Sequence, residues 1–453
     1  MSARIAIVGA GPTGFFLAER LLNQTEIPVA VDLFERLPAP YGLVRYGVAP
    51  DHEKIRNVTR AFDRTAARPG FRYAGHVDIG TDLTLDDLRA CYDQVCFTTG
   101  AQTDRRMGIP GEDLRNSHPA TEFVAWYNGH PEFRDRTFHL GARRVAVIGV
   151  GNVAVDVARI LCRTPEELAS TDIADHALEA LATSGIEEVL LLGRRGPVQA
   201  AFTTPEVKEL GELAGADVQV RPEEVTLDPE SEIDLAAGDE ATRRKVEILQ
   251  AYAQRTPTGA PRTLTLRFLV SPVELLGDDT GAVRALRVAR TALVRNPDGS
   301  LSARATDVVE EIPVDLVFRS VGYRGVPIPG IPFDERRGVV PNTAGRVLDP
   351  ATGTPLPRTY VAGWIKRGPS GVIGTNKPCA AETAAAMLED LRSGSLPPVT
   401  GPDAMDLLRE REVRYLTFAE WESIRGAEEA RGKAAGRPRV KLVDPAEYLA
   451  SPT

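Results

Sequence analysis

Two glycine-rich turns of one pattern occur in this chain, the first near its start and the second near residue 150. The first reads Gly9-Ala10-Gly11-Pro12-Thr13-Gly14, and the second reads Gly149-Val150-Gly151-Asn152-Val153-Ala154. Each turn follows a short apolar run and opens a helical pattern, which is the arrangement whose backbone N–H groups surround a pyrophosphate. The first glycine permits the tight turn, the second lets the backbone approach the phosphates, and the third small residue lets helix and strand pack. The spacing therefore predicts two dinucleotide-binding sites.

The residues that follow the next strand differ between the two units. In the first unit the run VAVDLFE ends at Glu35, whose carboxylate can accept hydrogen bonds from two ribose hydroxyls and repels a 2′-phosphate. In the second unit Arg194 and Arg195 stand there, with no acid. Two arginines can bind a 2′-phosphate through charge-assisted hydrogen bonds and stack on adenine. We therefore expect the first site to take FAD or NAD and the second to take NADP.

Local patterns indicate the elements that position these residues. We expect strand, helix and strand over residues 5–8, 15–22 and 29–35, and again over 145–148, 155–162 and the run VLLLGRR. A polar helical insertion is expected over about 165–184, and a β-rich, turn-rich stretch from about 218 to 317. The polar tail after Pro397, which contains Trp421, is expected to pack on the surface.

The length of 453 residues and two passages rich in Pro and Gly indicate more than one domain. We expect an α/β protein with two Rossmann-like dinucleotide-binding domains, the NADP-binding domain being inserted into the FAD-binding domain. The expected FAD-binding domain is discontinuous, with residues 1–105 and 326–453 including the C-terminal tail. The expected NADP-binding domain covers residues 106–325.

The composition argues against several classes of protein. A formal net charge of −9 disfavours nucleic-acid binding, which needs a basic excess. No apolar run is long enough to span a bilayer and the first residues leave no room for a secretory leader, so a cytoplasmic protein is expected. The four cysteines form no C-x-x-C pair and no spacing for zinc or an iron–sulfur cluster. We expect no metal site, and buried thiols at Cys91, Cys96, Cys162 and Cys379.

Five segments of the sequence resemble one known family: GAGPTGFF, PAPYGLVRYGVAPDHEKIRNV, GVGNVAVDVARIL, GRRGPVQAAFT and AGWIKRGPSGVIGTNK. Over nearly its whole length the chain is similar to the adrenodoxin reductase-like ferredoxin–NADP reductases, most closely to their bacterial FprA-type members. The resemblance implies an FAD-containing NADPH:ferredoxin oxidoreductase, with FAD held in the first domain and NADPH bound in the second. In such an enzyme a hydride passes from NADPH to N5 of FAD, and electrons then leave singly to a ferredoxin.

The resemblance also implies roles for individual residues. FAD contacts are implied for Thr13, Glu35, Leu43 and Ile79, and contacts to the isoalloxazine ring for Trp364, Gly371, Val372 and Ile373. NADP contacts are implied for Asn152, Val153, Arg194, Arg195 and Glu206, with Gly371 near the nicotinamide. His52 and Glu209 resemble the family's active-site pair near the flavin.

Hydride transfer requires the nicotinamide C4 to lie against the flavin N5 with water excluded. Gly371 and Gly374 flank the expected start of a helix, and its N-terminus would stabilise negative charge on the reduced ring. Asp156, one turn into the helix of the second unit and near the expected domain interface, is a further candidate catalytic residue.

Docking of an acidic ferredoxin on this acidic chain requires a local basic patch. One candidate is a helix face with Arg56, Arg60, Arg64 and Arg68, which recur every four residues. The other candidate is the cluster Arg243, Arg244 and Lys245. Solvated helix faces with no partner explain both patterns equally well.

Other functions fit the sequence less well. The alternative enzyme is an NADPH electron-input module similar to the small subunit of glutamate synthase, but that class usually carries cysteine-ligated clusters. A disulfide reductase is disfavoured because C-x-x-C is missing, and a flavin monooxygenase because the motif YGLVRYGVAPDH is present. A non-enzymatic nucleotide sensor would keep the glycine turns without needing the segment from Trp364 to Lys377.

Overall fold

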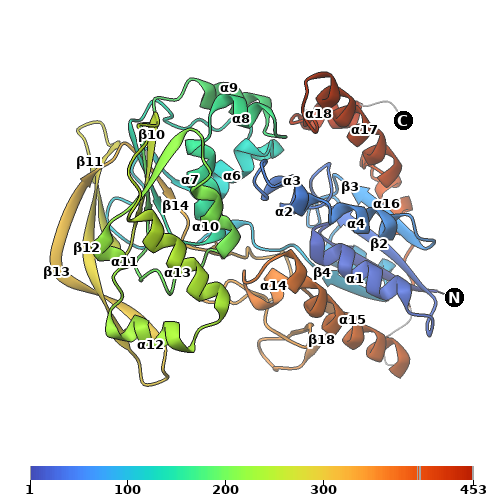
Figure 1. Cartoon of the computed structure of the whole chain (residues 1–453). Coiled ribbons are helices and arrows are strands. Elements are labelled where there is room, and N and C mark those ends of the chain that lie inside the picture. Colours follow the sequence, from blue (N-terminus) through green and yellow to red (C-terminus); the bar gives the residue numbers. More distant parts are fainter. Residues whose placement is uncertain (1, 395, 397–398, 451–453) are drawn as a thin grey trace. The chain divides into compact units, whose positions relative to one another are not determined.

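The computed structural model describes residues 2–394, 396 and 399–450 (Figure 1). The chain forms two compact units, of which the first comprises Met1–Thr103, Asn128–Pro131 and Gly322–Thr453 and the second comprises Asp104–Tyr127 and Glu132–Val321. The unit boundaries were expected at 105/106 and 325/326, and the return to unit 1 at Asn128–Pro131 was not expected. Each unit contains a mainly parallel sheet with a glycine turn after one strand, as predicted for an α/β protein with two Rossmann-like domains.

Unit 1 is built on a seven-stranded sheet. Its order is β16 (Asn342–Thr343), β17 (Arg346–Leu348), β18 (Pro355–Val361), β4 (Gln94–Phe97), β1 (Ala3–Val8), β2 (Val29–Glu35) and β3 (Phe71–Gly75). The strands from β18 to β3 are parallel, whereas β16 and β17 pair antiparallel. The two-residue strand β15 (Tyr323–Arg324) also belongs to the last segment of unit 1.

Helices cover both faces of this sheet, which is why its central strands are apolar on both sides. Ile5 and Ile7 of β1 face the core formed with α1 and α15, and Ala6 and Val8 face the core formed with α5 and α16. Helices α1 and α15 pack against each other, as Figure 1 shows. The helices are α1 (Pro12–Asn23), α2 (Leu43–Tyr46), α3 (Glu53–Arg56), α4 (Thr59–Ala66), α5 (Leu85–Cys91), α14 (Trp364–Arg367), the 3₁₀ turn η2 (Ile373–Thr375), α15 (Asn376–Ser393), α16 (Ala404–Glu410), α17 (Phe418–Ala434) and α18 (Pro445–Ala450).

Unit 2 contains a six-stranded parallel sheet and a three-stranded antiparallel sheet. The parallel order is β6 (Ser117–Pro119), β14 (Leu316–Arg319), β7 (Arg144–Ile148), β8 (Glu188–Leu192), β10 (Arg262–Arg267) and β9 (Ala216–Val220). The antiparallel sheet consists of β11 (Val270–Gly277), β12 (Val283–Arg295) and β13 (Leu301–Pro313). It covers one face of the parallel sheet, since Ala146 and Ile148 of β7 share a core with Leu286 and Val288 of β12.

Helices complete unit 2, and α7 packs on β7, β8 and β10. The helices are α6 (Ala120–Tyr127), α7 (Asn152–Cys162), α8 (Pro165–Ala169), α9 (Asp175–Ala182), α10 (Thr204–Leu210), α11 (Pro222–Val225), α12 (Pro229–Ala237) and α13 (Glu240–Tyr252), with the short elements β5 (Thr103–Asp104) and η1 (Pro131–Phe133) at the unit boundaries. Helices α11 to α13 correct the expectation of a β-rich stretch from residue 218, because after β9 ends at Val220 the next strand starts only at Arg262. Val246 and Leu249 are buried three residues apart, which is a helical and not a strand period.

The C-terminal tail was expected on the surface, and this prediction is wrong for α17. Trp421 is fully buried at 0% exposure in the core that also contains Phe15 and Met387. The tail was expected to start after Pro397, and Pro397 itself lies outside the described residues. One apolar face is enough to bury a helix whose average composition is polar.

The four cysteines are buried and free, as expected. Among the helices that the structure describes, none is both long and apolar enough to cross a membrane.

Candidate functional site

The first glycine turn joins β1 to α1 in the predicted way. Gly9 has φ +108°, and a Cβ there would lie 2.8 Å from the Thr98 carbonyl oxygen, so both the conformation and the space require glycine. A Cβ on Gly14 would lie 2.2 Å from the Gly9 carbonyl oxygen, which explains why helix and strand meet only with glycine there. At Gly11 a Cβ would have no described heavy atom within 4 Å. There is therefore no room for a side chain at Gly9 or Gly14, where the turn packs on the protein. There is free space at Gly11, where a phosphate would approach.

Glu35 lies at the end of β2 and faces this turn. Its Oε2 accepts a hydrogen bond from Ala10 N at 2.8 Å, and its Oε1 accepts one from Leu37 N at 3.0 Å. Burial raises the pKa of Glu35, while these backbone N–H groups act in the opposite direction. A carboxylate has about four lone-pair sites, so acceptor capacity remains for ribose hydroxyls.

The other residues expected to contact FAD also lie in unit 1. Thr13 is buried at the start of α1, and its Oγ1 would be 2.4 Å from a Cβ on Gly363, the residue before Trp364. Leu43 begins α2 and is partly exposed, at 37%. Ile79 is partly buried and packs against the core on the α5 and α16 face of the sheet.

The segment expected to face the isoalloxazine ring is a loop between α14 and η2. The Arg367 guanidinium holds this loop: Nη1 donates to Ser370 O and Oγ at 2.5 and 2.9 Å, and Nη2 donates to Thr375 Oγ1 and Asn376 Oδ1, both at 3.1 Å. Trp364 Nε1 donates to Ser370 O at 3.1 Å. Sequence reasoning missed Arg367, although it stands inside the motif AGWIKRGPSG.

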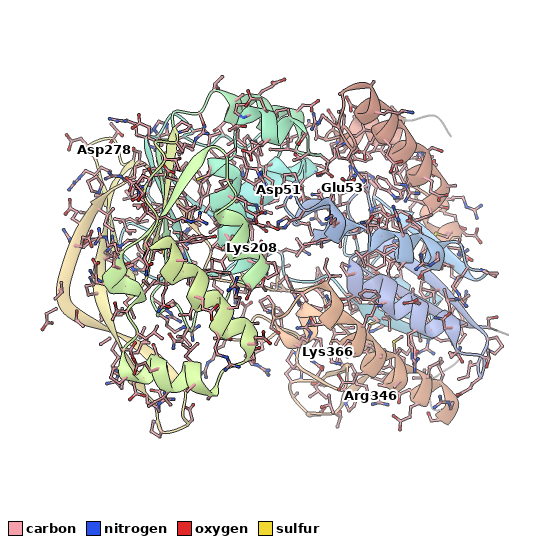
Figure 2. All side chains as sticks on the ribbon, viewed as in Figure 1. Asp51, Glu53, Lys208, Asp278, Arg346 and Lys366 are labelled. Carbon is pink, nitrogen blue, oxygen red and sulfur yellow. The ribbon has the colours of Figure 1, made fainter. Side chains whose placement is uncertain are left out.

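Within this loop Gly371 has φ +79°, Val372 is 58% exposed and Ile373 begins η2. The 3₁₀ turn η2 starts at Ile373 and leads directly into α15 at Asn376, so Gly371 and Gly374 lie on either side of the start of this helical stretch, as expected. Lys366, labelled in Figure 2, anchors α14 to α15 because its Nζ donates to Glu382 Oε2 at 2.6 Å.

The second glycine turn joins β7 to α7 in unit 2. Gly149 has φ +132°, and a Cβ there would lie 2.1 Å from the Ser320 carbonyl oxygen. At Gly151 a Cβ would have no described heavy atom within 4 Å. Asn152 Oδ1 accepts a hydrogen bond from Thr203 N at 2.9 Å, and Val153 follows it as a partly buried residue of α7. As in the first turn, there is no room for a side chain at the first glycine and free space at the second.

Arg194 and Arg195 follow β8, and their backbone is fixed while their guanidinium groups are not. Thr291 Oγ1 donates to Arg194 O at 2.7 Å, and Leu269 N donates to Arg195 O at 3.2 Å. Neither guanidinium has an ion pair or hydrogen bond to any residue that the structure describes. Burial first, and the neighbouring Arg194 charge second, lower the pKa of Arg195. Such a pair of like charges would be stabilised by an anion placed between them.

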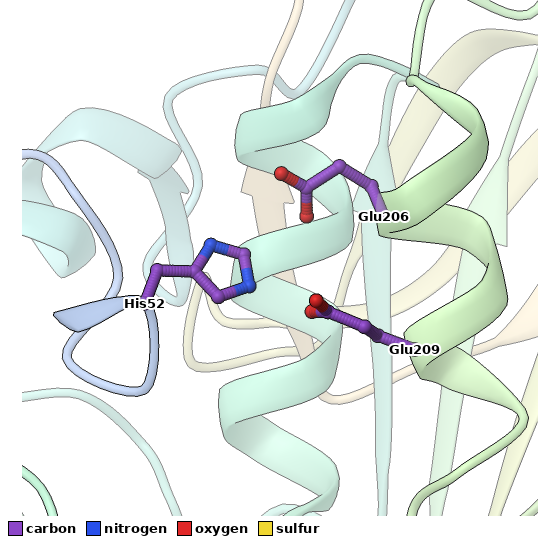
Figure 3. Close-up of side chains that lie close together, drawn as sticks. All are labelled: His52, Glu206 and Glu209. Carbon is purple, nitrogen blue, oxygen red and sulfur yellow. The ribbon is translucent and has the colours of Figure 1, made fainter. Parts of the chain in front are cut away.

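The remaining acidic candidates are connected by a residue that sequence reasoning missed. Arg159 of α7 is 0% exposed; its Nη2 donates to Asp156 Oδ1 at 2.7 Å and its Nη1 to Glu206 Oε2 at 3.3 Å. The same Nη1 lies 3.8 Å from Glu209 Oε2. Figure 3 shows both glutamates projecting from α10. Arg159 therefore fixes the orientation of three predicted site residues within unit 2.

His52, also drawn in Figure 3, is the partly buried residue that precedes α3 in unit 1. Its ring makes no capping hydrogen bond to that helix. The imidazole of His52 therefore does not act as the N-terminal cap of α3.

The arginine face expected over residues 56–68 is corrected by the structure. The helix breaks between α3 and α4, and Arg56 is buried, donating to Val48 O at 2.7 Å and Asn128 Oδ1 at 2.9 Å. Only Arg60 and Arg64 of this set are exposed on α4. On α13, Arg243 and Arg244 are exposed, as expected for the other candidate, but Lys245 is buried and its Nζ donates to Ala200 O.

The class of protein follows from a comparison with family models. Residues 3–196 match the model described as pyridine nucleotide-disulphide oxidoreductase. This match includes both glycine turns and indicates an oxidoreductase with two dinucleotide sites, a class that the full-length relatives decide.

Relatives over the full length narrow this class. The chain is 47% identical to NADPH-ferredoxin reductase FprA of Mycobacterium leprae, with 98% of this chain and 97% of that protein covered. It is 40% identical to the mitochondrial NADPH:adrenodoxin oxidoreductase of Arabidopsis thaliana, covering 99% and 95%. The solved structure of Mycobacterium tuberculosis FprA in complex with NADPH matches with a TM-score of 0.93 and 45% identity, covering 99% of both chains. The chain therefore belongs to the adrenodoxin reductase-like ferredoxin–NADP reductase family.

Proposed function

We propose that this chain is an FAD-containing NADPH:ferredoxin oxidoreductase, with residues 1–105 and 326–453 binding FAD and residues 106–325 binding NADP. The contrast between Glu35 in unit 1 and the Arg194–Arg195 pair in unit 2 carries this proposal. A carboxylate beside the ribose disfavours a 2′-phosphate, and two guanidinium groups that have no ion pair or hydrogen bond to a described residue favour one. We further propose a cytoplasmic location.

Both sites fit the groups that the family implies. At Gly11 and Gly151 the space that a Cβ would occupy is free and could admit a phosphate. At Gly9 and Gly149 a Cβ would collide with a backbone carbonyl oxygen. Bound NADPH would supply a hydride to N5 of bound FAD, and the reduced flavin would supply single electrons to the ferredoxin.

The residues of this chain would bind and orient the two groups. Glu35 is proposed to bind the ribose of FAD, and the loop that Arg367 holds is proposed to face the flavin ring. His52 and Glu209 are proposed as the active-site pair, on the resemblance to the family. Asp156 is proposed to act as a positioning residue through Arg159, which also holds Glu209.

An anaerobic titration of the purified protein tests this function. We expect a yellow protein whose flavin absorbance is bleached by NADPH far more readily than by NADH, and is restored when a ferredoxin is added. A protein that takes up no FAD would contradict the proposal. Bleaching by NADPH without reoxidation by any ferredoxin would favour an electron-input module with a different acceptor.

For the ferredoxin we propose docking on Arg243 and Arg244 of α13. Arg243 donates to the Gly238 carbonyl at 2.5 Å and forms no salt bridge with a described residue, although its charge, after hydrogen bonds to that carboxylate, lowers the pKa of the neighbouring Asp239; Arg244 is paired with Glu247 at 2.9 Å. We expect R243E/R244E to raise KM for ferredoxin about tenfold at low salt, because reversing exposed charges removes electrostatic steering. The difference should shrink with added salt, since screening removes both attraction and repulsion.

The matched control is R60E/R64E, which reverses the two exposed charges of α4. We expect this variant to keep its KM for ferredoxin, and both variants to keep their rate of flavin reduction by NADPH. A larger effect of R60E/R64E would move the docking surface to α4, and equal damage to flavin reduction in R243E/R244E would contradict a docking role.

A further inference from the structure

Tyr41 adopts a backbone conformation that is uncommon for a residue with a side chain. Its φ is +83°, and the following residue, Gly42, has φ +50°. Positive φ at a bulky residue persists only when the surrounding structure imposes it. The observation raises the question of what holds this turn and what it does there.

The backbone of the turn lies directly on the first glycine turn. Tyr41 N donates to Ala10 O at 2.8 Å. A Cβ on Gly42 would lie 3.1 Å from Gly11 Cα, so the two backbones approach closely. Leu43, the next residue, is one of the residues expected to contact FAD. The Tyr41–Gly42 turn therefore forms part of the boundary of the proposed FAD site next to Gly11.

The side chain of Tyr41 is held by residues distant in the sequence. Its hydroxyl donates to Asp63 Oδ1 of α4 at 2.5 Å and accepts a hydrogen bond from Trp421 Nε1 of α17 at 3.2 Å. Arg425 Nη1, also from α17, donates to Asp63 Oδ2 at 2.8 Å. Burial, and after it the Asp63 charge, raise the pKa of Tyr41, so the hydroxyl remains a donor to Asp63. We call Tyr41, Asp63, Trp421 and Arg425 the Tyr41 latch.

We propose that the Tyr41 latch is a positioning device that holds the Tyr41–Gly42 turn against Gly11 and thereby sets how long FAD stays bound. This inference rests on the proposed function, because it concerns the proposed FAD site. The turn is strained, so loss of the hydroxyl contacts lets it relax away from Gly11. The Tyr41 ring, packed on Phe15 with 5.6 Å between ring centroids, would by itself keep the side chain buried but not fix the backbone.

The chain offers a matched control in a second buried tyrosine. Tyr360 of β18 donates its hydroxyl to Asp390 Oδ2 at 2.7 Å, and Arg346, labelled in Figure 2, pairs with Asp390 at 2.8 Å. Tyr41 with Asp63 and Arg425 is the same arrangement of tyrosine, aspartate and arginine. Y41F and Y360F therefore each remove a buried tyrosine hydroxyl that donates to an aspartate in unit 1. Only Y41F changes a residue of the turn that contacts the first glycine turn.

The experiment measures the rate of FAD release from the holoprotein after dilution, followed by flavin fluorescence, together with the Tm of each variant. We expect Y41F to release FAD about tenfold faster than Y360F and the wild type, while Tm falls by similar amounts in Y41F and Y360F. If Y41F does not fold, D63N removes the same contact from the other side and is expected to release FAD faster in the same way. Equal release rates in Y41F, D63N and Y360F would overturn the latch while leaving the proposed function intact. A wild-type protein that binds no FAD would overturn both.

Discussion

Replacing Arg194 and Arg195 with alanine will lower the preference for NADPH over NADH about a hundredfold. Each charged hydrogen bond to a 2′-phosphate is worth about 1.5 kcal/mol, and two of them correspond to roughly a hundredfold in affinity. NADH has no such phosphate, so its use should change little. The measurement is the ratio of kcat/KM for the two nucleotides with an artificial electron acceptor.

The control for this variant is R336A/R337A, which removes an adjacent exposed arginine pair from unit 1. It changes the net charge by the same amount, so it shows how much of the effect is general electrostatic attraction of the nucleotide. If R194A/R195A keeps its preference, or if both double variants lose it equally, the assignment of the 2′-phosphate to Arg194 and Arg195 is wrong.

Gly149→Ala is expected to reduce kcat/KM for NADPH at least thirtyfold while FAD remains bound. Its φ of +132° is strained for alanine, and the added Cβ would lie 2.1 Å from the Ser320 carbonyl oxygen. Strain of this kind costs about 1–3 kcal/mol and overpacking about 1–3 kcal/mol, and 2 kcal/mol already corresponds to roughly thirtyfold. The measurement is the rate of flavin bleaching over a range of NADPH concentrations.

Gly259→Ala is the matched control, because Gly259 has φ +83° but an added Cβ meets no described atom within 4 Å. It carries the backbone strain without the overlap and lies in the same unit. Near-normal NADPH kinetics in G149A, or an equal loss of kcat/KM for NADPH in G259A, would contradict this prediction. Either result would show that the lack of space next to the Ser320 carbonyl oxygen is not the reason for glycine at position 149.

The sequence predicted the two strand–turn–helix units well because their signals are short in range. The strand expected over 29–35 is β2, and the strands expected over 5–8 and 145–148 lie within β1 and β7. A glycine pattern beside an apolar run specifies its local structure almost alone.

Features that depend on tertiary contacts were not predictable in this way. Arg159 stands in the last turn of an ordinary amphipathic helix, and only the packing of α10 on α7 makes it a buried partner of Asp156 and Glu206. Arg56 fits a helical period of four, yet the helix breaks after it and its side chain turns inward. Trp421 looked like a residue of a polar tail because much of the core it joins is formed by residues hundreds of positions earlier, such as Phe15.

The order of strands in unit 1 has a consequence for the synthesis of the protein. β18 pairs with β4, and α17 supplies Trp421 to Tyr41, so the last quarter of the chain completes a sheet begun at the N-terminus. Residues 132–321 of unit 2 are made in between and have their own sheet partners before β18 leaves the ribosome. The residues of unit 2 proposed to bind NADP are therefore in place first, and the proposed FAD site can close only once translation is nearly finished, so we expect flavin loading to be a late event in the maturation of this chain.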